Sequence, residues 1–300
     1  MAVCAHDAGA ASHLAAWLAP HHQRLRLCLE GPARDLFSMR LGLLPQYSLE
    51  ECLEGACMLI SGSGWSSDLE HNARLLARRR GIPSVAVLDH WTNYRTRFQR
   101  GGSEVLPDQL WVADAEALVL AQATFPDVSV LQLPNCWLTE LSQAVKNMRS
   151  APPQRPARRL LYLLEPIRVP WQGGPWPDEM GEMQGLLHWL DHLPRLADQD
   201  LIAPTEQLEA LALRPHPSEP AGKYDALIRQ ARQRWPIRLD ASTSLATALA
   251  WADAAFGCET QALVAALACG LPAFSTLPSW APACRLPHPA LHHLSRLEGP

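Results

Sequence analysis

The feature that most constrains this chain is a repeated alternation of short apolar runs with longer segments of helical periodicity. In the first half, the apolar runs have the length and the β-branched content of buried strands. They cover residues 2–5, 25–29, 57–61, 84–89, 109–113 and 128–133. Strands that alternate with helices are typical of a parallel sheet covered on both faces, so the pattern predicts a doubly wound α/β domain.

A second series of the same kind begins after the proline-rich segment at 150–159, which we interpret as a linker. Its expected strands are 160–164, 210–214, 237–240, 254–257 and 272–275, and its expected helices are 181–192, 222–234, 244–251 and 259–269. A chain of 300 residues exceeds the usual size of one domain. We therefore predict two Rossmann-like domains facing a cleft, residues 1–150 and 151–300, with an irregular tail after Ser279.

The clearest helical signal lies at residues 67–80. Ser67 and Glu70 have the spacing of a capping box, in which the two side chains satisfy backbone N–H groups at the helix start. Gly81 then provides a stop. The sequence thus predicts Glu70 as a capping residue.

Composition excludes several classes of protein. A net charge of −4 gives no basic footprint, so we expect no nucleic-acid partner. The cysteine spacing matches neither a zinc site nor a disulfide framework. No run approaches the roughly 20 apolar residues of a membrane span, and the first residues lack a cationic leader. We expect a cytoplasmic protein, and peripheral association with a membrane stays open.

The strongest chemical motif is Arg-Pro-His-Pro-Ser-Glu at 214–219, which follows an expected strand. Arg214, His216 and Ser218 would lie at the carboxyl edge of the sheet, where such folds bind ligands. The flanking prolines would present the imidazole rigidly to a phosphate oxygen. The alternative is a simple turn in which Ser218 caps the next helix.

A second motif, Gly-Cys-Glu-Thr at 257–260, also follows an expected strand and opens a helix. The free N–H groups of a helix start favour an anion. Gly257 and Thr260 are candidate donor-binding residues, and Glu259 is placed to accept from sugar hydroxyls. Ser242 is a further candidate, with helix capping as its alternative, whereas the alternative for Glu259 is that it only complements the helix dipole.

The order of these motifs resembles the donor domain of GT-B glycosyltransferases, and among them bacterial capsule and sialyltransferase-type enzymes with an HP motif. The resemblance covers about residues 205–278. It implies that His216 faces the nucleotide phosphate and that Thr260 and Glu259 lie near the nucleotide. Cys258-Glu259-Thr260 departs from the expected pair of hydroxyl residues. A nucleotide sugar would be the donor substrate, with no cofactor and no metal.

The first domain would then bind the acceptor, a glycan or glycoconjugate. Asp7 ends the first strand and is the candidate base, with a turn-capping role as its alternative. The other candidates for acceptor or sugar binding follow strand ends. They are His13, Ser63, Asp89, His90, Asn93 and Arg95, together with Glu165 in the second domain.

The sequence analysis favours a metal-independent glycosyltransferase, and the arginines near residue 95 together with the HP resemblance suggest a CMP-activated acidic sugar of the sialic or pseudaminic type. Two alternatives stay open. One is a nucleotide-sugar epimerase or hydrolase, because a shared fold does not fix the reaction. The other is a nonenzymatic nucleotide-binding protein.

Overall fold

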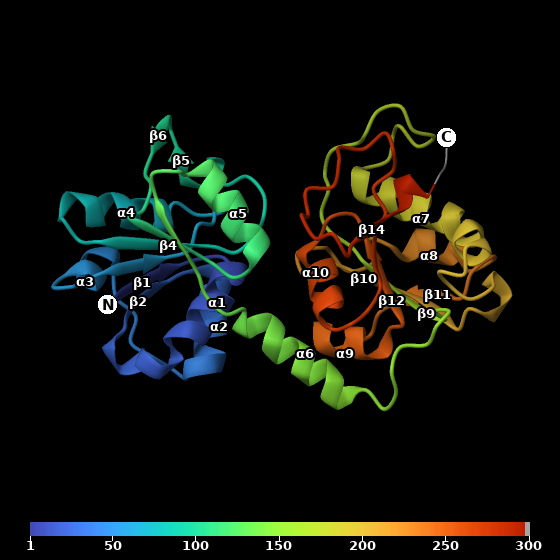
Figure 1. The fold of residues 1–300 in the computed structure, drawn as a ribbon, viewed down its shortest axis with the longest axis horizontal. Helices are drawn as coiled ribbons and strands as arrows, with labels where there is room; N and C mark the ends of the chain where they lie inside the picture. Colours follow the sequence, from blue (N-terminus) through green and yellow to red (C-terminus); the bar gives the residue numbers. More distant parts are fainter. Residues whose placement is uncertain (298–300) are drawn as a thin grey trace. The chain divides into compact units, whose positions relative to one another are not determined.

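The computed structural model describes residues 1–297 and divides into two compact units (Figure 1). The first unit is Met1–Trp137 and the second begins at Leu138. Helix α6 (Cys136–Met148) begins at the end of the first unit, and its residues from Leu138 onward group with the second unit, as does the proline-rich segment after it.

The first unit is built on a sheet of six parallel strands in the order β2-β1-β3-β4-β7-β8. The strands are β1 (Ala2–Ala5), β2 (Arg26–Leu29), β3 (Leu59–Ser61), β4 (Ser84–Leu88), β7 (Gln109–Val112) and β8 (Ser129–Gln132). The helices are α1 (Ala8–Leu18), α2 (Gly31–Leu41), α3 (Leu49–Leu53), α4 (Leu69–Arg79) and α5 (Ala115–Thr124). A small hairpin, β5 (Gln99–Arg100) with β6 (Ser103–Glu104), lies outside the sheet.

Strand alternation distributes the core of this unit over two faces of its sheet. Val3 and Ala5 of β1 pack in one cluster with α1 and α2. Ala2 and Cys4 pack in another with α3 and α4. Helices thus cover both faces, as a doubly wound sheet requires (Figure 1).

The second unit repeats the design with six parallel strands in the order β11-β10-β9-β12-β13-β14. The strands are β9 (Arg159–Leu163), β10 (Ala210–Arg214), β11 (Ile237–Leu239), β12 (Ala254–Gly257), β13 (Ala273–Ser275) and β14 (His292–His293). The helices are α7 (Gly181–Asp198), α8 (Asp225–Ala231), α9 (Leu245–Trp251) and α10 (Gln261–Ala268). Each unit also contains two short 3-10 helices among its described residues. They are η1 (Ala19–Arg24) and η2 (Thr96–Phe98) in the first unit, and η3 (Thr205–Gln207) and η4 (Leu294–Arg296) in the second.

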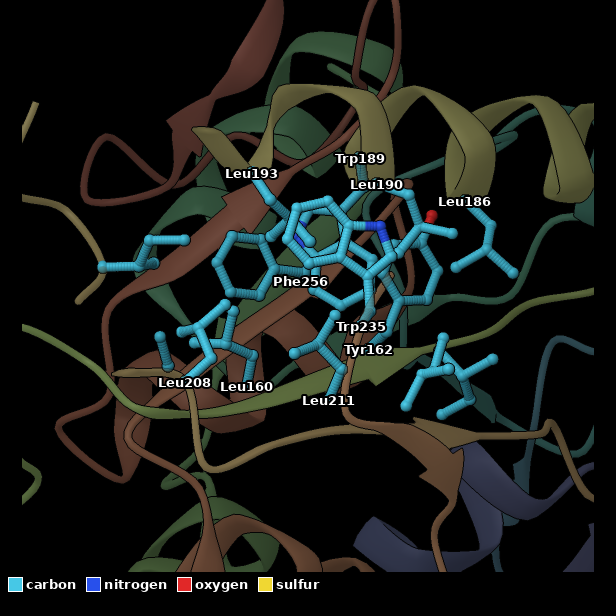
Figure 2. Close-up of a cluster of buried hydrophobic side chains, with 14 of the residues drawn as sticks. Leu160, Tyr162, Leu186, Trp189, Leu190, Leu193, Leu208, Leu211, Trp235 and Phe256 are labelled. Atoms are coloured by element: carbon cyan, nitrogen blue, oxygen red, sulfur yellow. The ribbon is translucent and has the colours of Figure 1, made fainter. Parts of the chain in front are cut away.

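Aromatic side chains fill the main core of the second unit, between α7 and the sheet (Figure 2). Trp189 of α7 is completely buried, and its ring centroid lies 4.8 Å from that of Tyr162 and 5.2 Å from that of Phe256. Leu160 and Leu211 complete the strand side of this cluster. Several of the tryptophans are therefore packing residues.

The structure confirms two Rossmann-like doubly wound domains and moves some boundaries. Helix α7 continues through Pro194 to Asp198, past its expected end at residue 192. The tail after Ser279 is not wholly irregular, because β14 adds to the sheet edge beside β13. None of the helices within residues 1–297 has the length and apolar character needed to span a bilayer.

Candidate functional site

Each sheet has a point where the chain order reverses, and in such folds ligands bind outside the carboxyl ends of the strands at that point. In the first unit the reversal is at β1, which lies between β2 and β3. In the second unit it is at β9, which lies between β10 and β12. We call the carboxyl ends of β1 and its neighbouring strands the first edge, and the carboxyl ends of β9 and its neighbouring strands the second edge.

Asp7 follows β1 at the first edge, and its carboxylate does not cap α1. Its Oδ1 lies 2.6 Å from Nδ1 of His6. Its Oδ2 packs against the backbone of Gly64, where an added Cβ would overlap it. The turn-capping alternative is therefore excluded, and the carboxylate points to the glycine turn after β3.

The structure corrects the predicted role of Glu70 in a capping box. Its side chain turns inward from α4 and is 0% exposed, and its Oε1 accepts a hydrogen bond of 3.1 Å from the backbone N–H of His6. Its Oε2 has no hydrogen-bond partner among residues 1–297 and lies 3.0 Å from the Cβ position of Gly64. Burial, with a smaller contribution from the charges of Asp7 and Asp89, raises the pKa of Glu70 to about 7.

Asp89 follows β4 and completes a group of three carboxyl side chains at the first edge. Its Oδ2 packs against Gly9, and its Oδ1 accepts a hydrogen bond of 3.1 Å from Nη1 of the buried Arg97. Nε of Arg97 also donates to the Thr92 carbonyl at 3.1 Å. The arginine neutralises Asp89 and fixes its position.

Ser63 and His13 do not present their polar atoms to a ligand, contrary to prediction. Ser63 is 0% exposed, and its hydroxyl donates to the carbonyl of Val87 at 2.7 Å. His13 is 2% exposed on the inner face of α1, with its ring stacked on Trp17 at 5.1 Å. Burial lowers the pKa of His13, so its ring is neutral and serves packing.

Arg95 and Asn93 are also reassigned by the structure. The Arg95 guanidinium donates to Glu104 at 3.2 Å and to the carbonyl of Thr124 at 3.0 Å, so its charge is already paired. Asn93 is exposed with a φ of 59°, a left-handed conformation that asparagine tolerates in turns. His90 lies half-buried beside Asp89, and its Nδ1 accepts from the backbone N–H of Trp91 at 2.9 Å.

At the second edge, His216 lies exposed just beyond β10. Its Nδ1 lies 3.2 Å from the backbone N of Ser218 and 2.8 Å from the Ser218 hydroxyl oxygen. Because a backbone N–H can only donate, Nδ1 accepts and the ring proton of the neutral imidazole is on Nε2. Partial burial lowers the pKa of His216, which favours this neutral form.

The His-Pro-Ser-Glu segment is both a turn and a means of presenting the imidazole. The backbone N–H of Glu219 donates to the carbonyl of His216 at 2.9 Å and closes the turn. The carboxylate of Glu219 is held by Arg168 at 2.6 Å and Lys223 at 2.7 Å. Ser218 thus orients His216 and does not cap α8, which begins at Asp225.

Arg214 is a structural residue, contrary to its predicted place in a phosphate clamp. Its Nη1 donates to the buried carboxylate of Asp240 at 2.5 Å and to the carbonyl of Ser242 at 3.2 Å. The backbone N–H of Ser242 in turn donates to Asp240 at 3.0 Å. These bonds tie the ends of β10 and β11 together and neutralise the arginine.

Glu165 and Glu259 meet at the middle of the second edge. Oε1 of Glu165 accepts a hydrogen bond of 2.6 Å from the backbone N–H of Glu259, and burial raises the pKa of Glu165 to about 7. Both carboxylate oxygens of Glu259 accept hydrogen bonds from Arg285. Glu259 is therefore already paired, contrary to the prediction that it accepts from sugar hydroxyls. Gly257 is required here because a Cβ would lie 2.7 Å from the Leu163 carbonyl oxygen.

Thr260 is the N-cap of α10, where its hydroxyl oxygen accepts from the backbone N–H of Ala262 at 3.3 Å. Sequence reasoning had treated it as a nucleotide contact. The hydroxyl and the helix start nevertheless lie at the second edge, where β9 separates the strand before Thr260, β12, from the strand before His216, β10.

Sequence reasoning missed Glu70 and His6 as parts of the first edge, and it assigned Arg97 to an anionic substrate, whereas the arginine pairs with Asp89. One signal for Glu70 was present, because it shares the helix face of Ala73 and Ala77, which are apolar and buried. A carboxyl on the buried face of a helix indicates a partner in the interior. Nothing in the spacing of His6 distinguishes it from its neighbours.

Comparison with known proteins gives matches in structure but none in sequence. No protein-family model and no curated protein matches the chain. The crystal structure of UDP-GlcNAc 2-epimerase from Methanocaldococcus jannaschii is similar over 91% of this chain and 82% of its own, with 12% identity and a TM-score of 0.56. A putative UDP-N-acetylglucosamine 2-epimerase from Listeria monocytogenes is similar over 91% of this chain and 78% of its own, with 12% identity and a TM-score of 0.51.

At this level of identity the likeness concerns the fold alone. It extends over both units, each with the same class of parallel sheet. The chain therefore has a GT-B-type fold made of two Rossmann-like domains.

Proposed function

We propose that this chain is a nucleotide-sugar-dependent glycosyltransferase that binds the donor at the second edge. The observation that carries the proposal is the exposed imidazole of His216, oriented by Ser218 so that Nε2–H is the ring's donor. A phosphate oxygen is a strong acceptor for such a donor. The hydrogen bond strengthens as negative charge develops on the departing nucleotide, which is the condition for catalysis.

The proposal assigns the acceptor to the first edge. Asp7 takes the proton of the acceptor hydroxyl as that oxygen forms a bond to the anomeric carbon of the donor, and the bond from this carbon to the phosphate oxygen breaks. The acceptor in this proposal is a glycan or glycoconjugate. His6, 2.6 Å from Asp7, fixes the carboxylate.

A CMP-activated acidic sugar remains the narrower proposal for the donor. It is supported only by the resemblance of the HP motif, because Arg95 and Arg97 are both paired with carboxylates.

A nucleotide-sugar epimerase is the second candidate. It is favoured by the names of both fold neighbours and by the three carboxyl groups of Asp7, Glu70 and Asp89 at the first edge, which suit proton transfer. The two functions differ in what happens without an acceptor. An epimerase converts the sugar of its donor, detectable by proton NMR, whereas a transferase leaves the sugar configuration unchanged.

The first experiment is a thermal-shift panel with CMP, CDP, UDP and GDP. A ligand at 100 times its Kd stabilises the folded state by about 2.7 kcal/mol, so we expect one nucleotide to raise the melting temperature clearly. His216→Ala should weaken its binding by about tenfold, the cost of roughly one charge-assisted hydrogen bond. His21→Ala, at an exposed histidine of the first unit, is the control. Stabilisation by none of the four nucleotides, or wild-type binding by His216→Ala, would contradict the proposal.

A further inference from the structure

Trp65 is the one exposed tryptophan among the eleven in the chain, all of which lie within residues 1–297. Its side chain is 47% exposed. Exposing an indole forgoes the stabilisation that its burial would supply. The residue lies in the loop between β3 and α4 at the first edge, directly after Gly64, which contacts Asp7.

The ring of Trp65 is held in place from one side. The guanidinium carbon of Arg97 lies 5.2 Å from the ring centroid, within the range of a cation–π contact. Arg97 is itself 8% exposed and anchored to Asp89 and to the carbonyl of Thr92. The loop is anchored as well, because Nη2 of Arg100 donates to the Gly64 carbonyl at 2.9 Å. Trp65 is thus an exposed aromatic surface on a rigid support.

The charges around Trp65 restrict what can lie on it. Arg97 is paired with Asp89, and Arg100 is paired with Asp68 at 3.2 Å. The cations that contact Trp65 and Gly64 are therefore already neutralised. The carboxylate of Asp7, which packs on Gly64, accepts hydrogen bonds and repels anions. A ligand here combines an apolar ring face with hydroxyl donors and carries no negative charge.

We propose that Trp65 is the stacking platform for a neutral pyranose ring of the acceptor, with the axial C–H groups of the sugar on the indole face. The inference rests on the proposed function and deepens it by naming the acceptor class. It also separates the roles of the two edges, since the nucleotide is assigned to the second unit and the stacked sugar to the first.

The test uses protein labelled with 5-fluorotryptophan, in which the resonance of Trp65 is identified by its loss in Trp65→Phe. The probes are methyl β-D-glucopyranoside, methyl β-D-galactopyranoside and methyl β-D-glucuronide, followed by fluorine NMR. We expect the neutral glycosides to shift the Trp65 resonance and the glucuronide to bind more weakly. Trp65→Ala should reduce glycoside affinity about fivefold to tenfold, and Trp65→Phe should retain part of it.

Trp251 is the matched control. It is a partly exposed tryptophan in the second unit, with Arg238 placed 4.8 Å from its ring centroid, and it lies at the end of α9, before β12. Its resonance should not respond. No glycoside-dependent shift at Trp65, an equal shift at Trp251, or a shift of Trp65 with nucleotides in place of glycosides would each overturn the inference.

The response of Trp65 to glycosides and the thermal-shift panel with nucleotides are independent tests. If a nucleotide binds and Trp65 does not respond to glycosides, the platform is wrong and the transferase proposal stands. If Trp65 responds and no nucleotide binds, the first unit binds sugar and the transferase proposal is wrong.

Discussion

The first and second edges share one feature, a glutamate that accepts a hydrogen bond from a backbone N–H group, but they differ in the residues around this glutamate. In each unit a glutamate whose pKa burial raises to about 7 accepts the backbone N–H of a residue that follows a neighbouring strand. Glu70 accepts from His6, and Glu165 accepts from Glu259. A parallel sheet leaves backbone N–H groups unpaired where its strands end, and a carboxyl group satisfies them.

The surroundings of these glutamates determine what each edge suits. Glu70 is completely buried, and its neighbours are the carboxylates of Asp7 and Asp89 around a glycine turn. Glu165 is partly exposed, and next to it Glu259 is bound by Arg285. The first edge is therefore suited to accept protons, whereas the second presents the neutral imidazole of His216 as a donor.

The largest effect should come from neutralising the two glutamates. Because the pKa of Glu70 is raised from 4.5 to about 7, the folded state keeps its proton where the unfolded chain has lost it. The free energy of unfolding therefore falls as the pH rises from about 4.5 to about 7, by about 3 kcal/mol. Glu70→Gln should remove this loss and gain stability relative to wild type over that range.

Glu165→Gln should behave alike and by a similar amount, because the pKa of Glu165 is also raised from 4.5 to about 7. The measurement is the urea midpoint at pH 5 and pH 8, with Glu206→Gln, at an exposed glutamate, as the control. The raised pKa of Glu70 would be contradicted if the urea midpoints of Glu70→Gln and wild type differed by the same amount at both pH values.

Alanine at the edge glycines should distinguish the two turns. The Cβ of Gly257→Ala would meet the Leu163 carbonyl oxygen at 2.7 Å, and a neighbouring strand cannot move aside. The Cβ of Gly64→Ala would meet the side-chain carboxylates of Asp7 and Glu70, and side chains adjust more readily than the backbone of a strand. We expect losses of about 3 kcal/mol for Gly257→Ala and about 1 kcal/mol for Gly64→Ala in the free energy of unfolding. Equal losses would show that the first turn is as rigid as the second.

The smallest single effect should be at Arg95, one of the two arginines that the sequence assigned to ligands. Arg214→Gln leaves the buried Asp240 carboxylate without its cation and should cost about 2 kcal/mol, reduced by the partial exposure of the arginine. Arg95→Gln breaks an exposed pair with Glu104 and should cost less than about 1 kcal/mol. Urea denaturation measures both. A loss of nucleotide binding in a folded Arg214→Gln protein would restore Arg214 to the phosphate site.

Local patterns of the sequence predicted much of the fold. Ala2–Ala5, Ala210–Arg214 and Ala254–Gly257 are strands with the bounds expected from their apolar runs. The position of His216 beyond a strand also followed from the motif, since prolines on both sides exclude a continuing strand. Partners distant in the sequence could not be predicted. Glu70 fits a local capping box equally well, and only the contact with His6, 64 residues away, makes it part of the first edge.

The sequence by itself determined two doubly wound domains and a histidine presented at the end of a strand, because hydrophobic periodicity and proline act over a few residues. The tertiary structure decided which charges are available. Arg214, Arg95 and Glu259 look free in the sequence and are neutralised by Asp240, Glu104 and Arg285. Glu70 looks like a surface cap and is buried. Pairing and burial depend on residues that the folded chain brings together from distant positions, and the charge of a side chain at a site is set by those neighbours.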